Sequence, residues 1–370
     1  PTPYRYLNAG ALLAERDALI RVLAELGVAE RPVTGDDQAL WTDWYLADPS
    51  RAHLDTGCEL FQVTLGAELE LEPAPGGRVR NRLTETEPLI LHGAARSDLT
   101  RPILWAGLDR DAPLEVSRLG IGIITYNRLA SLQRLVAGLR QYTSLPVELV
   151  VADDGSTDGT AAWCRSEGIR VVRGDNRGVA WNKNRALAWL LEWSDCDPIA
   201  LLEDDARVWE PGWQEEWVRA AAVWGHVNWS HHPPERSLGG CGTPEDPFRF
   251  VLHGGQCTFS EREALAAVGY LDTRFKGYGW EHREWTRRFG RHLRERWGNP
   301  PDAAPCLSSH VGVEFQATSF NQAEFERNRL LLDRLHREPV YRPPARTARE
   351  ALMLGQELAQ AGAQETRSFP

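Results

Sequence analysis

The chain has 370 residues, of which 42% are hydrophobic and 25% are charged. This is the composition of a globular protein with room for two domains, and it excludes a disordered, collagen-like or coiled-coil protein. The net charge of −10 argues against nucleic acid as a partner, because phosphate backbones require a basic surface. No apolar run reaches the roughly 20 residues that span a bilayer, and the six cysteines form no C-x-x-C pair. We therefore expect a cytoplasmic protein with reduced thiols.

The composition changes near residue 115, where a short polar stretch precedes a strongly apolar segment. We expect one domain over 1–115, a second over 116–335, and a polar, partly helical C-terminal tail over 336–370. The sequence does not begin with methionine, so we also expect that further chain precedes it.

Apolar runs alternate with helical periods after residue 118. The pattern predicts strands at 119–125, 147–152, 169–173 and 199–202, and helices at 129–142, 158–167, 180–193 and 321–335. Strands separated by helices indicate an α/β fold with a doubly wound, mostly parallel sheet.

Polar clusters follow the ends of these predicted strands. In chain order they are Thr125-Tyr126-Asn127, Asp153-Asp154-Gly155-Ser156, Asp175-Asn176-Arg177 and Glu203-Asp204-Asp205. Because parallel strands end at one edge of a sheet, where ligands bind, we expect the clusters to meet there. Carboxylates suit a divalent metal ion and arginine suits phosphate, although solvated acidic turns and helix caps use the same residue types.

The order and spacing of T-Y-N, D-D-G-S-T-D-G-T, N-R-G and E-D-D over 119–213 resemble the nucleotide-binding half of family 2 glycosyltransferases, which have the GT-A fold. The resemblance implies a nucleotide-binding set and a metal ligand of the D-x-D type. These are Thr125, Tyr126 and Asn127 for the nucleotide pocket, Asp154 for uracil or a similar base, Arg177 for the diphosphate, Asp204 for the ribose and Asp205 for the metal ion.

A second group of motifs fits the same family. His253-Gly254-Gly255-Gln256-Cys257 resembles the acceptor-side segment, in which Gly254 and Gly255 let the backbone approach the sugar. The run from Gly277 to His282 resembles the G-W-G-x-E-D element of galactosyltransferase-like members. This implies that Trp280, with Trp229 as a second candidate, stacks on the sugar.

The same element implies a carboxylate that removes a proton from the acceptor hydroxyl. His282 replaces the usual final Asp, so Glu281 is the first candidate for this base, His282 the second and Glu284 the third. His310 lies where such enzymes bring in a late histidine ligand, and imidazole favours Mn²⁺ over Mg²⁺. A structural histidine is the alternative.

The first domain resembles the latter half of the glycosyltransferase domain of procollagen lysyl hydroxylases. The resemblance covers about 4–105 and rests on Y-L-N-A-G, D-D-Q, E-L-F-Q and L-I-L-H-G. It implies that Asp36 and Asp37 lie at the acceptor side and that His92 is a metal ligand. The half with its own nucleotide and D-x-D motif would lie upstream, so we expect a partial GT-A-like domain, or a scaffold for the second domain.

Together these features predict a metal-dependent, inverting, hexosyltransferase-like enzyme. It would move a sugar from a nucleotide-diphosphate donor, a UDP-sugar with Mn²⁺ or Mg²⁺, to a hydroxyl on a glycan, protein or other biopolymer. One alternative is a non-catalytic module that binds sugar or nucleotide, because the base position departs from the family pattern. Another is a glycosyltransferase that modifies nucleic acid, which the acidic charge disfavours.

Overall fold

The chain divides into two compact units, Pro1–Asp111 and Ala112–Pro370. In the computed structural model, the described residues are 16–26, 44–51, 61–63, 71–74, 78–88, 90–92, 116–277, 279–298, 302–314 and 321–369. Among these residues, no helix combines the length and the apolar character needed to cross a bilayer.

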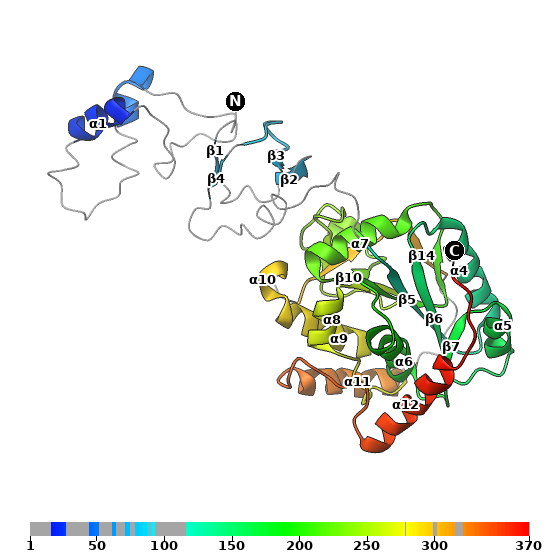
Figure 1. Cartoon of the computed structure of the whole chain (residues 1–370). Coiled ribbons are helices and arrows are strands. Elements are labelled where there is room, and N and C mark those ends of the chain that lie inside the picture. Colours follow the sequence, from blue (N-terminus) through cyan, green and yellow to red (C-terminus); the bar gives the residue numbers. More distant parts are fainter. Residues whose placement is uncertain are drawn as a thin grey trace. The chain divides into compact units, whose positions relative to one another are not determined.

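The first unit contains short elements (Figure 1). They are α1 (Arg16–Glu25), the 3₁₀ helix η2 (Pro49–Arg51), β1 (Phe61–Val63), β2 (Leu71–Ala74), β3 (Arg78–Asn81) and β4 (Ile90–His92). β1 pairs with β4 in parallel, and β2 pairs with β3 in antiparallel orientation. Asp36 and Asp37 lie outside the described residues, and His92 is placed only as the last residue of β4, so their roles stay predictions.

An eight-stranded sheet forms the centre of the second unit, in the order β11-β13-β10-β12-β8-β5-β6-β7. Its strands are β5 (Leu119–Thr125), β6 (Val147–Asp153), β7 (Arg170–Arg173), β8 (Ile199–Glu203), β10 (His226–Trp229), β11 (Phe248–Phe250), β12 (Cys257–Ser260) and β13 (Ala304–Leu307). The β8-β5-β6-β7 block is parallel, whereas β12 runs antiparallel to both its neighbours. The predicted α/β fold with a mostly parallel sheet is confirmed.

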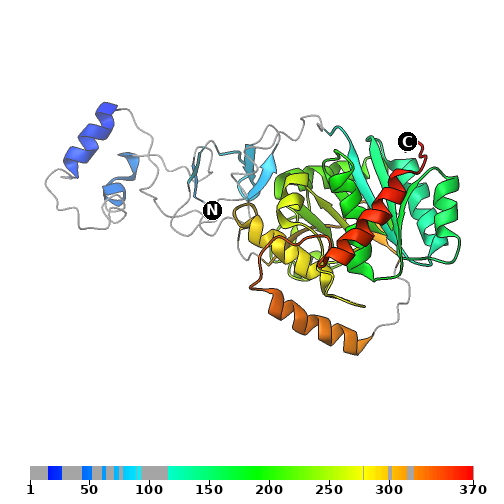
Figure 2. The same cartoon turned by 60° about the horizontal axis from the view of Figure 1, so that its bottom comes forward.

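Helices surround this sheet (Figure 2). They are α4 (Leu129–Tyr142), α5 (Thr160–Ser166), α6 (Val179–Glu192), α7 (Trp213–Trp224), α8 (Arg262–Val268), α9 (Glu281–His292), α10 (Arg294–Trp297), α11 (Gln322–Leu335) and α12 (Ala348–Gly362). α6 packs against β5 and β6, whereas α7 packs against β10 and β12. The four strands and four helices predicted from the pattern are all present, with ends shifted by at most two residues.

The sequence of β5, L-G-I-G-I-I-T, explains how α6 comes so close to the sheet. All seven residues are buried. A Cβ atom added to Gly122 would lie 2.8 Å from the Cβ of Ala186 on α6, which is closer than van der Waals contact allows. Glycine at this position thus lets α6 pack close against β5.

The segment expected as a polar tail, 336–370, contains α12. This helix packs against β7 and α6 and buries Leu354, Leu358 and Ala361. Figure 1 shows it next to β7, the last strand of the sheet. The C-terminal segment is thus part of the packed unit.

Candidate functional site

The ends of β5, β6 and β8 bring three of the predicted motifs together. Thr125 Oγ1 donates a hydrogen bond of 2.7 Å to Asp204 Oδ2, and the backbone N–H of Asp154 donates to the carbonyl oxygen of Thr125 at 3.1 Å. Parallel pairing of β5 with both β6 and β8 causes this convergence. The T-Y-N, D-D-G-S and E-D-D motifs therefore form one site, at the edge where ligands bind to such sheets.

Asp204 and Asp205 are buried carboxylates that both lie beside the guanidinium group of Arg128. Burial raises the pKa of each to about 6, and Arg128 Nη1 lies 3.4 Å from Asp204 Oδ1 and 3.5 Å from Asp205 Oδ2. Asp205 Oδ1 is buried without a hydrogen-bond partner among the described residues. A buried, unpartnered carboxylate oxygen fits the oxygen ligand that a Mg²⁺ or Mn²⁺ ion prefers.

The structure does not bring His310 to this pair of aspartates. A two-stranded sheet of β9 (Ala206–Val208) and β14 (Val311–Val313) pairs Val311 with Val208, so His310 lies at the opposite end of β9 from Asp205. His310 Nδ1 is instead 2.7 Å from Glu210 Oε2. Within the described part of the chain, no group of three or more His, Cys, Asp or Glu residues could hold a metal ion.

The carboxylate of Asp154 forms hydrogen bonds with other groups of the protein. Its carboxylate accepts hydrogen bonds from Arg185 Nη1 at 2.6 Å and from the backbone N–H groups of Arg177 and Gly178 at 2.9 and 2.8 Å. The side chain is 4% exposed, so these bonds form in a desolvated place. Asp154 thereby orders the loop after β7, and its bond to a base stays a prediction.

The other predicted nucleotide contacts lie in the loops around this edge. Tyr126 is 46% exposed, which leaves its ring open for stacking. Asn127 has a positive φ of 51°, and its Oδ1 accepts a hydrogen bond of 2.7 Å from the backbone N–H of Thr157, which joins the first two motif loops. Arg177 lies over the ring of Trp181, 4.6 Å from its centroid.

Lys183 links the two groups of motifs, and the sequence patterns did not single it out. Its side chain is 1% exposed. Nζ donates hydrogen bonds to Glu203 Oε1 at 2.8 Å and to the carbonyl oxygen of Gly255 at 3.0 Å. The predicted acceptor-side segment is therefore held against the E-D-D motif. A buried lysine is rare enough to be a signal, but burial is visible only in the fold.

The three candidate bases have different surroundings. Burial raises the pKa of Glu281, and its Oε2 is buried with no hydrogen-bond partner in the described structure. His282 is held through Nε2 at 2.8 Å from Asn228 Oδ1, and burial lowers its pKa well below the usual 6.5. Glu284 accepts hydrogen bonds from Arg288 Nε at 3.1 and 3.0 Å, which makes it part of a buried ion pair.

The glycines of the acceptor-side segment allow close packing beneath it. A Cβ atom on Gly254 would lie 2.8 Å from the ring of Trp229, and one on Gly255 would lie 2.9 Å from the ring of His282. Trp229 is 5% exposed, so its ring packs against this segment and is not accessible for stacking on a sugar. Trp280 is partly buried and its ring packs on Phe325, with centroids 5.0 Å apart.

The second unit is thus an α/β domain with a mostly parallel sheet and buried carboxylates at the strand ends. Residues 121–226 match the family model "Glycosyl transferase family 2", and residues 2–103 match "PLOD GT domain". Residues 121–226 of the second unit therefore resemble glycosyltransferase family 2, and residues 2–103 of the first unit resemble the PLOD glycosyltransferase domain. Both predicted resemblances are confirmed.

Curated and solved relatives cover parts of the chain. It is 34% identical over 117 residues to the N-acetylglucosaminyl-diphospho-decaprenol L-rhamnosyltransferase of Mycobacterium tuberculosis, a match of 29% of this chain and 38% of that protein's length. Among solved structures, S. aureus TarS 1-349 in complex with UDP has 16% identity and a TM-score of 0.44, covering 65% of this chain and 70% of that one. The mannosyltransferase PcManGT from Pyrobaculum calidifontis, in complex with GDP-Man and Mn²⁺, has 16% identity and a TM-score of 0.42, covering 69% and 77%.

Proposed function

We propose that the second unit is a glycosyltransferase that moves a sugar from a nucleotide-diphosphate donor to a hydroxyl acceptor. The observation that carries this proposal is the buried pair Asp204 and Asp205 at the strand ends, with Asp205 Oδ1 unpartnered within the described structure. Arg128 offsets part of the charge of these two desolvated carboxylates, and Asp205 Oδ1 remains available to a metal ion. The family 2 match of the same residues supports this interpretation.

The donor nucleotide would lie across the ends of β5, β6 and β8. Thr125 fixes the carboxylate of Asp204, which leaves Asp204 Oδ1 directed toward ribose hydroxyls and Arg128. The exposed ring of Tyr126 would stack on the base, and Arg177 in the ordered loop would approach the diphosphate. We propose a UDP-sugar as the donor.

Asp205 would hold the divalent metal ion, with phosphate oxygens of the nucleotide completing its coordination. Such an ion offsets the charge that develops on the departing nucleoside diphosphate. The position of His310 beside Glu210 gives that histidine a structural role in this proposal. Mn²⁺ and Mg²⁺ both suit a carboxylate and phosphate site.

Glu281 is the proposed base. It begins α9, where its buried and unpartnered Oε2 is free to accept a proton from an acceptor hydroxyl, and its raised pKa brings the group nearer to neutral pH, where general bases work best. Attack by the hydroxyl on the face opposite the nucleotide inverts the anomeric carbon. His282 would orient the neighbouring segment through Asn228.

A donor screen tests this function. The protein would be mixed with uridine, guanosine and thymidine diphosphate sugars, with Mn²⁺ or with EDTA, and nucleotide release and thermal unfolding would both be recorded. Metal-dependent release of nucleoside diphosphate from one donor supports the enzyme. A thermal shift with nucleotide, but no release with any acceptor class, would instead support a non-catalytic binding module. Absence of both effects would overturn the proposal.

A further inference from the structure

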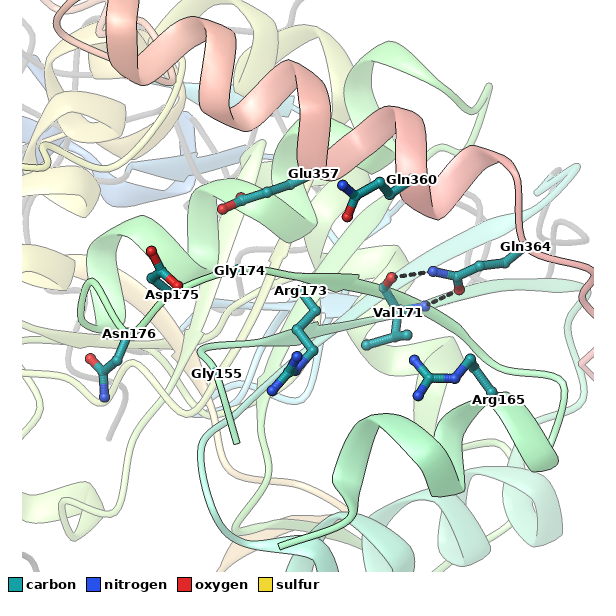
Figure 3. Close-up of a pocket in the computed structure, with 10 residues that line it drawn as sticks. All are labelled: Gly155, Arg165, Val171, Arg173, Gly174, Asp175, Asn176, Glu357, Gln360 and Gln364. Atoms are coloured by element: carbon teal, nitrogen blue, oxygen red, sulfur yellow. Dashed lines mark hydrogen bonds between the residues drawn. The ribbon is translucent and has the colours of Figure 1, made fainter. Parts of the chain in front are cut away.

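The C-terminal helix α12 falls outside the residues that match the family 2 model. It lies beside the donor-side loops, which are the loop that carries Asp154 and the loop over 175–178. It packs against β7 and α6. Beyond the helix, Gln364 pairs with the backbone of Val171, accepting a hydrogen bond of 3.0 Å and donating one of 2.8 Å (Figure 3). Because β7 is the last strand of the sheet, this segment covers its open edge.

Glu357 on α12 forms a buried ion pair with Arg185 on α6. Glu357 Oε2 accepts from Arg185 Nε at 2.9 Å, and Oε1 accepts from Nη2 at 3.1 Å. Arg185 is fully buried and Glu357 is 9% exposed. A two-point contact of this kind fixes the plane of the guanidinium group.

The other N–H groups of Arg185 reach the donor-side loops. Nη1 donates to Asp154 Oδ1 at 2.6 Å, and Nη2 donates to the carbonyl oxygen of Asp175 at 2.8 Å. Asp154 in turn accepts from the backbone N–H groups of Arg177 and Gly178. One continuous set of hydrogen bonds therefore runs from α12 to the loop over 175–178.

Gly174 makes room for this contact. A Cβ atom added there would collide with Glu357 Oε1 and with Arg185 Nη2. Figure 3 shows Glu357 extending from α12 toward the segment that carries Gly174 and Asp175. The φ of Gly174 is not in the left-handed region, so the requirement for glycine here comes from space and not from backbone conformation.

We propose that Glu357 is a positioning residue of the donor site. By fixing Arg185 it orients Asp154, and Asp154 orders the loop over 175–178 before the nucleotide binds. The inference rests on the proposed function, because it assigns that loop to nucleotide binding. Loss of the Glu357 charge then weakens donor binding and leaves the chemical step intact, since Glu357 touches no reacting group.

Glu357→Gln tests this proposal, because glutamine keeps the size of the side chain and removes its charge. The Kd values of UDP, GDP and thymidine diphosphate, each with Mn²⁺, would be measured by calorimetry, and KM and kcat would be measured with the active donor. We expect the Kd and the donor KM to rise about tenfold with kcat within a factor of two to three of the wild-type value. Gly174→Ala displaces both Glu357 and Arg185, because an added Cβ collides with each, and it should raise the Kd at least as much.

Gln364→Ala is the matched control. It removes two hydrogen bonds between the same C-terminal segment and β7 without touching Arg185, so we expect a lower melting temperature and an unchanged Kd. Equal nucleotide binding by wild type and Glu357→Gln, or equal weakening by Gln364→Ala, would overturn the positioning role alone. Failure of the wild type to bind any of the uridine, guanosine and thymidine diphosphates would instead overturn the proposed function and this inference with it.

Discussion

Lys183 on α6 donates a hydrogen bond of 2.8 Å to Oε1 of Glu203, the residue that precedes the aspartate pair. The same ammonium group donates to the carbonyl oxygen of Gly255, and its charge lowers the pKa of Glu281, which burial raises. One buried cation thus joins the predicted metal side of the site to the predicted acceptor side, and it favours the ionised form of the proposed base.

Replacing Lys183 by methionine should shift the pH profile of transfer. Without the ammonium group the pKa of Glu281 rises further, and a base must be deprotonated to act, so the acidic limb of kcat/KM should move to higher pH. Rates across pH 5 to 9 measure this. Lys276→Met is the control, because Lys276 is exposed and is the only other lysine of the chain. If the acidic limb does not move, the charge of Lys183 does not set the pKa of the base.

Asp205→Asn should abolish the effect of Mn²⁺ on nucleotide binding. The amide keeps the shape of the side chain but loses the charge that attracts the ion, so we expect transfer to fall by roughly 100-fold or more. Thermal unfolding with UDP or GDP, with and without Mn²⁺, is the readout. Asp333→Asn, at an exposed position of α11, serves as the control. Undiminished Mn²⁺ dependence in Asp205→Asn would remove Asp205 from the metal site.

Glu281→Gln should lower kcat by about 100-fold to 10,000-fold while nucleotide binding stays unchanged, because only the acceptor proton loses its base. Glu284→Gln is the informative comparison. It breaks the buried ion pair with Arg288, so we expect it to lower the melting temperature first and the rate only in proportion to folded protein. A near-normal kcat in well-folded Glu281→Gln would transfer the role to His282.

The three buried histidines should contribute stability that is lost as the pH drops below 6.5, whereas Asp204 and Asp205, whose pKa values burial raises to about 6, contribute with the opposite sign. Burial lowers the pKa of His226 and His282 well below 6.5 and that of His253 to about 3. In the unfolded chain each takes up a proton near pH 6.5, whereas in the folded chain it stays neutral, so stability is present above pH 6.5 and is lost progressively below it. Denaturation from pH 7.5 to 4.5 measures the slope.

His253→Asn should reduce that slope by about one proton in the range between pH 6 and 4, since one neutral buried histidine is removed. His336→Asn provides the matched control, because His336 is exposed at the end of α11. If both variants keep the wild-type slope, the buried histidines do not control the acid sensitivity.

Gly122→Ala should destabilise the second unit by about 1–3 kcal/mol, because its Cβ would lie 2.8 Å from the Cβ of Ala186 and would push α6 off the sheet. Gly355→Ala offers the opposite case. Gly355 lies within α12 with nothing within 4 Å of an added Cβ, so alanine there should stabilise the helix by about 0.5–1 kcal/mol. Urea denaturation of both variants distinguishes packing from helix propensity.

Four strands of the central sheet, four helices and the meeting of the motifs at the strand ends could be predicted from the sequence. A continuous apolar run reveals the buried strand β5, and apolar residues at a period of 3.6 reveal helices such as α4, because both patterns are local properties of the chain. The convergence of Thr125 with Asp204 follows from the same pattern, since parallel strands end at one edge. It required no knowledge of side-chain contacts.

The tertiary structure alone decided which side chains pair across the fold. Three contacts of the site join residues that are 72 to 172 positions apart in the sequence. They are Arg128 with Asp204, Lys183 with Gly255, and Glu357 with Arg185. The separation of His310 from Asp205 depends on the register of β9 and β14. Burial and register arise only when the whole chain packs, so no local pattern in the sequence encodes them.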